Sequence, residues 1–257
     1  MAVVGEHFVA RQAIFGLSHE VMAYELLFRD SLANFFPDID GDTASTRVIA
    51  DSFLVFGIEE LTGRARAFLN FSRRPLIEGS ALLLPRDRVV VEILETVEPD
   101  AEVVEACRRL KQAGDTLALD DFVLSPGQEP LLRLADIIKV DFRLTPAPER
   151  QRLSRLLGSR GMTMLAEKVE TQEEYEEALA SGYELFQGYY FSRPTVLARR
   201  ELPTLKVQYL RFLREVNAPD IEFVTAADSQ AAESRGPAAQ GGAPVRGDAA
   251  GTFHSRR

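Results

Sequence analysis

The sequence TLALDDF at residues 116–122 joins a strand-like apolar run to two adjacent acids, Asp120 and Asp121. Neighbouring residues on a strand point to opposite faces, so at most one of these acids can face the interior side of a regular strand. A carboxylate placed where a buried strand opens into a loop is costly unless it is paired or binds a metal ion. An isolated pair of aspartates is typical of a turn or a helix cap. A binding site is favoured only if other strands of the chain end in the same way.

Strand patterns occur on both sides of this stretch, and helical patterns alternate with them from residue 44 onward. The first two strands, His7–Phe15 and Glu20–Phe28, are joined by the short link GLSH, which predicts an antiparallel hairpin. Further strands are predicted at Ala67–Ser72, Val89–Leu94, Thr116–Phe122, Ala135–Val140, Met162–Ala166 and Glu184–Phe186. Helices are predicted at Ala44–Leu61, Pro99–Gln112, Glu129–Leu134, Pro146–Ser159, Thr171–Ser181 and Thr204–Val216.

This alternation with short connections predicts an α/β fold, in which crossover helices link the strands of a parallel sheet. Roughly seven or eight strands in about 200 residues are typical of a closed (β/α) barrel of the TIM type. An open doubly wound sheet is the alternative. We expect the barrel to occupy residues 1–200 and a helical extension residues 201–224. Residues 225–257 are rich in Ala, Gly, Ser, Pro and Arg, and this composition predicts a disordered tail.

The composition indicates the cellular compartment of the protein and argues against some classes of binding partner. A formal charge of −9 over 257 residues argues against non-specific binding to DNA or to an anionic membrane. The single cysteine, Cys107, cannot form an intramolecular disulfide and fits a reducing cytoplasm. The sequence shows no signal peptide, and no apolar run approaches the roughly 20 residues that span a bilayer. We therefore expect a cytoplasmic protein without DNA or membrane partners.

Polar residues lie at or just after the ends of most predicted strands, where the chemistry of a (β/α) barrel is found. They are Glu25, Asn70, Glu92, Asp120, Asp121, Lys139, Glu167 and Gln187. Each alone could serve as a cap, a turn residue or an ion-pair partner, but their convergence on one barrel mouth favours a site. Carboxylates with an amide oxygen, and no nearby Cys or His, suit Mg²⁺ or Mn²⁺. Two such ions can hydrolyse a phosphodiester, with Lys139 and Arg29 adding positive charge for the phosphate.

At these residues the chain resembles the EAL family of cyclic di-GMP phosphodiesterases. The resemblance rests on motifs in the same order along residues 6–195, namely YELLFR at 24–29, FLNFS at 68–72, VEILE at 91–95, LDDF at 119–122, IKVD at 138–141, AEKVET at 166–171 and QGYYFSRP at 187–194. It implies a modified (β/α)8 TIM-like barrel with an antiparallel first strand, and hydrolysis of cyclic di-GMP to pGpG. It also implies metal ligands at Glu25, Asn70, Glu92, Asp120, Asp121 and Glu167, with catalytic roles for Glu25, Lys139, Glu167 and Gln187. Arg29 matches a substrate-phosphate contact.

Three departures from the family pattern leave an alternative open. The signature tripeptide reads Glu25-Leu26-Leu27 instead of Glu-Ala-Leu, the glycine-rich loop after Phe122 is replaced by VLSPGQE, and Lys168 stands where the family usually has glycine. The altered loop puts the second metal ion in question. The pattern looks more like the EAL half of EAL–HDOD signalling proteins, and we expect the HDOD half to be missing. The alternative function is a weak or inactive barrel that acts as a cyclic di-GMP receptor or a protein-interaction module, as a homodimer or with a signalling partner.

Overall fold

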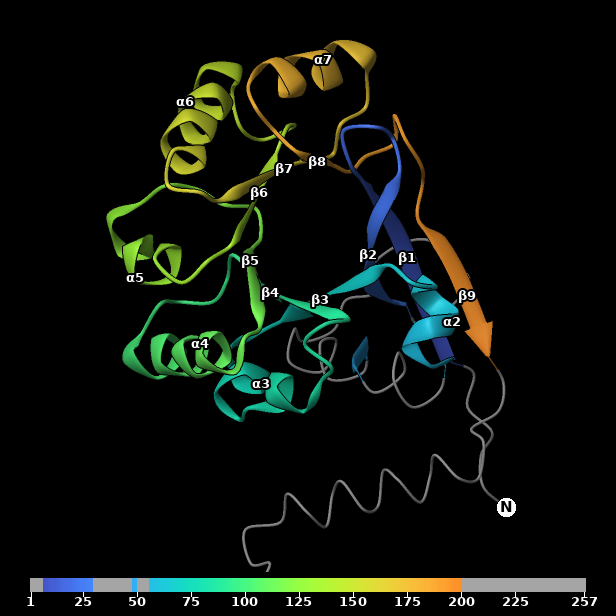
Figure 1. Ribbon diagram of the computed structural model, residues 1–257, viewed down its shortest axis with the longest axis vertical. Coiled ribbons are helices and arrows are strands. Elements are labelled where there is room, and N and C mark those ends of the chain that lie inside the picture. The colour runs from blue at the N-terminus through green and yellow to red at the C-terminus, as the bar shows by residue number, and fades with distance from the viewer. Residues whose placement is uncertain (1–6, 30–47, 50–55, 200–257) are drawn as a thin grey trace, which may run out of the picture. The chain divides into compact units, whose positions relative to one another are not determined.

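The computed structural model describes residues 7–29, 48–49 and 56–199 (Figure 1). The strands are β1 His7–Phe15, β2 Val21–Arg29, β3 Arg66–Phe71, β4 Val89–Ile93, β5 Thr116–Leu119, β6 Ile137–Asp141, β7 Thr163–Glu167, β8 Leu185–Phe186 and β9 Thr195–Arg199. The α-helices are α2 Ile58–Thr62, α3 Arg73–Ile77, α4 Ala101–Ala113, α5 Glu129–Leu132, α6 Ala147–Gly158 and α7 Gln172–Ala180. The predictions for the helix Thr204–Val216, the extension 201–224 and the tail 225–257 lie outside the described residues.

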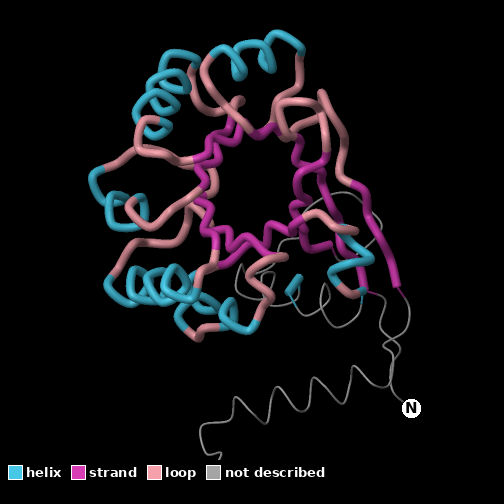
Figure 2. Tube along the Cα trace, viewed as in Figure 1, coloured by secondary structure: helices cyan, strands magenta, loops and turns pink. Residues whose placement is uncertain are grey.

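The strands form a closed barrel, which excludes the open doubly wound sheet (Figure 2). Strands β2 to β8 follow one another in parallel around the ring. Strand β1 closes the ring by pairing antiparallel with β2 along most of its length and with β8 at Phe15 and Phe186. The first strand is therefore antiparallel to the other seven, as the sequence predicts. Each parallel strand has its carboxyl end at the same mouth of the barrel.

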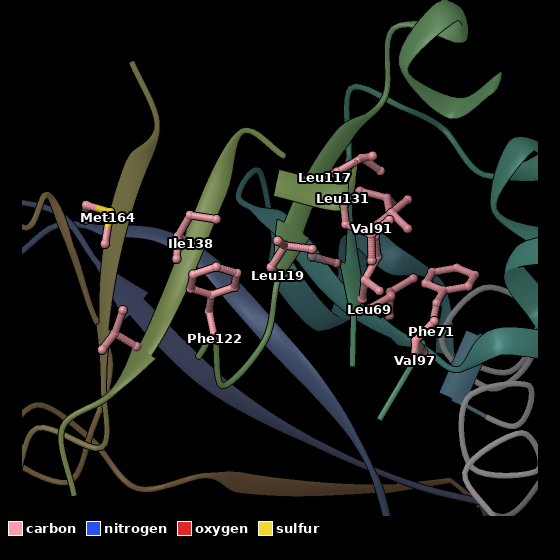
Figure 3. Packing of buried hydrophobic residues seen from close by; sticks show 14 of the residues in the cluster. Leu69, Phe71, Val91, Val97, Leu117, Leu119, Phe122, Leu131, Ile138 and Met164 are labelled. Atoms are coloured by element: carbon pink, nitrogen blue, oxygen red, sulfur yellow. The ribbon is translucent and has the colours of Figure 1, made fainter. Parts of the chain in front are cut away.

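The outward faces of the strands and the inner faces of the helices form the larger hydrophobic core. Val91, Leu117 and Ile138 from three strands belong to it, together with Cys107 of α4 and Leu157 of α6. Figure 3 shows part of this cluster, with side chains of β3 to β7 beside Leu131 of α5. The near-continuous apolar runs of these strands follow from this arrangement, because a strand of a (β/α) barrel is buried on both faces.

The inward faces of the strands form a second, separate core. It contains Ile14, Ala23, Phe68, Val90, Ala118, Ile137 and Leu165, with Leu185 packed against it. All but Ile14, which belongs to β1, come from the parallel strands β2 to β8. These side chains fill the interior of the barrel and make a floor beneath the mouth.

Local sequence signals set the helix ends. The side chain of Asp100 accepts a hydrogen bond from the backbone N–H of Val103 and caps α4, which ends at Gly114 with a φ of 92°. Thr171 and Glu174 form a capping box at the start of α7. These signals explain why both helices were predictable within a residue or two. No helix among the described residues is long and apolar enough to cross a bilayer.

One prediction of secondary structure needs correction, and two elements, helix α3 and strand β9, were not predicted. The helix predicted at Ala44–Leu61 does not run through Gly57, whose φ of 84° is left-handed, and α2 begins only after it. Strand β9 was not predicted, and it pairs antiparallel with the first half of β1 from His7 to Arg11. Its sequence, TVLAR, does not alternate between apolar and polar residues, and its partner lies at the other end of the described chain. The overlong helix and the missed strand arise because backbone conformation at glycine and long-range pairing are not visible in local periodicity.

Candidate metal centre

A single rule of spacing places the polar side chains at the mouth. On six parallel strands, the inward-facing apolar residue is followed two positions later by a polar residue of the predicted site. The pairs are Ala23 and Glu25, Phe68 and Asn70, Val90 and Glu92, Ala118 and Asp120, Ile137 and Lys139, and Leu165 and Glu167. Leu185 and Gln187 repeat the spacing at β8. Because side chains alternate along a strand, residues two apart share a face, and the polar residues form a ring above the apolar floor.

Lys139 lies at the centre of this ring, and its side chain is fully buried. Its Nζ lies 2.8 Å from Asp120 Oδ1, 2.9 Å from Glu167 Oε1 and 3.9 Å from Glu25 Oε2. It also donates a hydrogen bond to Glu92 Oε1. One ammonium therefore faces four carboxylates, and this part of the site has an excess of negative charge.

Glu25 is held by two neutral amides. Asn70 Nδ2 donates to Glu25 Oε1 at 3.2 Å, and Gln187 Nε2 donates to Glu25 Oε2 at 2.6 Å. These three residues come from β2, β3 and the end of β8, so the contacts join both sides of the mouth. Both carboxylate oxygens of Glu25 have a partner, which fixes the orientation of the side chain.

The position of Gln187 depends on its neighbour Gly188. A Cβ at Gly188 would lie 2.1 Å from the carbonyl oxygen of Val169 and 2.3 Å from its backbone nitrogen. The glycine thus lets the two backbones approach closely, and the N–H of Val169 donates to the carbonyl of Gln187 at 3.0 Å. The glycine of the QGYY motif is required for the strand end that presents Gln187 to Glu25.

The two adjacent acids after β5 both reach the site. Asp120 continues the inward face of the strand, whereas Asp121 has a left-handed backbone with a φ of 38°. This departure from strand geometry removes the limit that alternation sets on neighbouring residues. Carboxylate oxygens of Asp120, Asp121 and Glu167 all lie within 4.8 Å of one another and could share a metal ion. A cavity of about 310 Å³ opens beside Asp120 and Asp121, lined by the altered loop after Phe122.

Lys168 and Asp141 belong to the same mouth, although neither was predicted as a site residue. Lys168 Nζ lies 3.2 Å from Asp121 Oδ1 and 3.3 Å from Asp121 Oδ2, and it also contacts Asp141 Oδ2. Asp141 is buried, and its Oδ1 accepts the backbone N–H groups of Arg143 and Leu144 at 2.6 and 2.9 Å. The available signal was the spacing on β6, because Asp141 lies two residues after Lys139 and therefore faces the same interior.

Burial and charge shift the protonation equilibria of the ring. Burial raises the pKa of Glu92 and of Glu167 well above the usual value, and the attraction of Lys139 offsets this only in part. Burial alone would lower the pKa of Lys139, but the surrounding carboxylates outweigh it and hold that pKa well above its usual value. Burial alone would raise the pKa of Asp120, but the charge and hydrogen bond of Lys139, together with hydrogen bonds to Glu92 and Glu167, outweigh burial and lower that pKa. Without a further cation, the site retains protons on its most buried glutamates.

The donor set fits a hard divalent cation. Four buried oxygens of the ring accept no hydrogen bond, namely Asn70 Oδ1, Glu92 Oε2, Glu167 Oε2 and Gln187 Oε1. Buried acceptors without a donor are rare, because each loses its hydration without compensation. All four are carboxylate or amide oxygens, which are the ligands that Mg²⁺ and Mn²⁺ prefer. A bound cation would satisfy them and neutralise the excess carboxylates.

The structure thus brings together the predicted residues Glu25, Asn70, Glu92, Asp120, Asp121, Lys139, Glu167 and Gln187. Arg29 ends β2, but its side chain lies outside the described part of the chain. The roles predicted for these residues remain predictions.

Comparison with known proteins gives consistent matches. Residues 74–194 match the family model described as EAL domain. The chain is 41% identical over 221 residues to the cyclic di-GMP phosphodiesterase CdgJ of Vibrio cholerae, covering 84% of this chain and 51% of CdgJ. It is 40% identical over 225 residues to the uncharacterized protein YuxH of Bacillus subtilis, covering 85% of this chain and 55% of YuxH. The chain thus spans about half the length of these relatives. Among solved structures, the calcium and cyclic di-GMP complex of Klebsiella pneumoniae BlrP1 is similar, with a TM-score of 0.62 and 26% identity over 76% of this chain and 59% of BlrP1.

Proposed function

Because this chain belongs to the EAL domain family, we propose that it hydrolyses cyclic di-GMP to the linear dinucleotide pGpG with the help of divalent metal ions. The observation that carries this proposal is the ring of carboxylates at the barrel mouth, with four buried oxygens that lack a hydrogen-bond donor. The similarity to CdgJ, which is named a cyclic di-GMP phosphodiesterase, and to the BlrP1 complex supports the choice of substrate.

We propose that Mg²⁺ or Mn²⁺ is held by the carboxylates and the amide oxygen that the sequence singled out, namely Glu25, Asn70, Glu92, Asp120, Asp121 and Glu167. A bound cation would supply a water molecule activated for attack on phosphorus and would stabilise the leaving oxygen. Glu92 and Glu167 would have to release their protons when the cation binds, because burial raises their pKa values in its absence. Cation affinity is therefore expected to increase with pH.

The remaining residues would hold Glu25 in position and neutralise negative charge on the carboxylates and the phosphate. Lys139 stays protonated near neutral pH, because the carboxylates around it raise its pKa, so it acts as a fixed positive charge and not as a general base. Its ammonium would donate a hydrogen bond to the attacking water or to the phosphate. Gln187 and Asn70 would keep Glu25 in one orientation through their amide hydrogen bonds. We also propose that Arg29 binds the substrate phosphate through its planar guanidinium.

The test is incubation of the purified protein with cyclic di-GMP and Mg²⁺ or Mn²⁺, with separation of the products by chromatography. The control is Glu25→Gln, which keeps the size of the side chain and removes its charge. We expect pGpG from the wild-type chain and at least a hundredfold less from the variant, about the loss that follows removal of one catalytic group. Product at the level of the variant would refute the proposal. Binding of cyclic di-GMP with Ca²⁺ by calorimetry, without such turnover, would support the receptor instead.

A further inference from the structure

Lys168 is a charged residue at a backbone position that favours glycine. It directly follows Glu167 at the end of β7, and its φ of 56° lies in the left-handed region. Side chains with a Cβ rarely adopt this conformation, because the Cβ crowds the following carbonyl oxygen. A lysine therefore costs stability here relative to glycine, and its side chain must make contacts that offset the cost. Those contacts are with two aspartates of the barrel mouth.

The ammonium of Lys168 bridges these two aspartates in the manner of a metal ion. It lies at nearly equal distances from both oxygens of Asp121, 3.2 and 3.3 Å, and it contacts Asp141 Oδ2 on its other side. The other oxygen of Asp141 already accepts two backbone N–H groups. All four oxygens of the two aspartates are therefore satisfied within the chain.

The oxygens around Lys168 differ in this satisfaction from those around Glu25 and Glu92. The buried oxygens that lack a donor belong to Asn70, Glu92, Glu167 and Gln187, and none belongs to Asp121 or Asp141. The part of the mouth around Glu25 and Glu92 therefore contains oxygens without a hydrogen-bond donor. In the part around Lys168, the oxygens of Asp121 and Asp141 all have one. Displacement of the ammonium would leave the buried carboxylate of Asp141 without its counter-charge, which is strongly unfavourable.

We propose that Lys168 is a resident cation of this site: its ammonium takes the place of a second metal ion between Asp121 and Asp141, so that the centre binds one divalent ion. Of the ligands proposed above, Asp121 then pairs with Lys168 instead of with that ion. This deepens the proposed function and rests on its metal centre. The ammonium contacts both aspartates and so supplies the positive charge that a second ion would bring between them. One divalent ion on the side of Glu25 then suffices to satisfy the remaining oxygens.

The experiment is a titration with Mn²⁺ alone, without nucleotide, measured by equilibrium dialysis and by electron paramagnetic resonance. We expect the wild-type chain to bind one Mn²⁺ and to give the spectrum of an isolated ion. Lys168→Gly removes the ammonium and fits the left-handed backbone, so it should fold and bind two Mn²⁺. Two ions about 3.5–4 Å apart, the usual spacing of such pairs, couple magnetically and change the spectrum. Lys168→Met, which keeps the length of the side chain without its charge, should also bind two.

Two control variants test whether the number of bound Mn²⁺ ions depends on the charge of residue 168 and not on the loss of any lysine. Lys168→Arg keeps the charge and should still bind one Mn²⁺. Lys111→Met removes a lysine that pairs with Asp136, a residue just before β6 at the opposite end of the barrel, and should also leave the stoichiometry at one. The proposal is overturned if the wild-type chain binds two coupled ions or none, or if Lys168→Gly and Lys168→Met both still bind one. If the Lys168 variants bind two ions and the wild-type chain forms no pGpG in the hydrolysis assay, the proposed phosphodiesterase activity is refuted. The role of Lys168 is then left intact.

Discussion

Replacement of Lys139 by methionine tests whether the ring of carboxylates depends on the buried ammonium at its centre. Methionine keeps most of the volume of the side chain and removes only the charge and its hydrogen bonds. In the wild-type chain the ammonium lies 2.8 Å from Asp120 and 2.9 Å from Glu167, and it also contacts Glu92. Without it, these carboxylates face one another in a buried space with no counter-charge. The variant should therefore be strongly destabilised when no metal is present.

The magnitude follows from the burial of the group. Breaking a buried ion pair by removal of one partner costs about 3–5 kcal/mol, because the remaining charge is left uncompensated. Four carboxylates contact this one ammonium, but Glu92 and Glu167 can relieve the repulsion by taking up protons. We therefore expect a loss of about 3–5 kcal/mol in the free energy of unfolding at about pH 8, a large share of a typical total of about 5–15 kcal/mol.

The sign of the pH dependence is fixed by the raised pKa values of these glutamates. Their pKa values in the folded chain lie above the value of about 4.3 expected in the unfolded chain. The folded state then holds protons that the unfolded state has released, so the free energy of unfolding falls as pH rises above about 4.3. Loss of Lys139 raises these pKa values further. The destabilisation should therefore be smaller at about pH 5.5 than at about pH 8.

The assay is urea unfolding followed by circular dichroism in EDTA, at both pH values, for the wild type and the variant. Lys111→Met is the matched control, because Lys111 pairs with the partly exposed Asp136 and should cost only about 1 kcal/mol. Mn²⁺ should restore part of the stability of Lys139→Met, since the ion supplies positive charge to the same oxygens. A loss no larger than that of the control at about pH 8, or a larger loss at about pH 5.5, would refute this account of the site.

Three further experiments test other parts of the structure. Gly188→Ala should lower the free energy of unfolding by about 2–4 kcal/mol, because its Cβ would overlap the backbone of Val169; Gly161→Ala, where no atom lies within 4 Å of the added Cβ, should cost only about 1 kcal/mol in the same urea titration. Thr171→Ala removes the capping box of α7 and should cost about 1 kcal/mol, and an unchanged unfolding midpoint would contradict the cap. Cys107 is buried and its pKa is raised to about 12, so it should not react with a thiol reagent until the chain is unfolded; rapid labelling of the folded protein would show that the thiol is accessible.

The ring of the site could be predicted because each member interrupts an apolar run at the end of a strand. Glu92 and Lys139 stand among Val and Ile residues, where packing alone would favour another apolar side chain. The constant spacing of two residues from the inner apolar layer explains why separate strands deliver their polar groups to one place. Strand alternation is a property of the local chain, so it could be used before any tertiary structure was known.

The part of the mouth formed by Asp121, Asp141 and Lys168 could not be predicted in the same way. Its geometry depends on left-handed backbone at Asp121 and Lys168, and periodicity contains no information on such conformations. Asp141 resembled an ordinary strand end, and its role appears only when Lys168 from the next strand reaches it. The substitution of lysine for the glycine usual in the family was visible in the sequence. Which carboxylates it contacts was not.

The position of β1 has a consequence for the order in which the barrel can assemble. Its hairpin with β2 joins neighbours in the chain, and the parallel pairs from β2 to β8 each need only the next crossover unit. The pairing of β1 with β8 and β9 instead joins opposite ends of the described chain, through Phe15 with Phe186 and His7 with Arg199. On a ribosome, these ladders cannot form until β8 and β9 have emerged, so the barrel stays an open sheet with an unpaired edge until late in synthesis. Gln187 reaches Glu25 only after this closure, so ring and fold should be completed in the same late step.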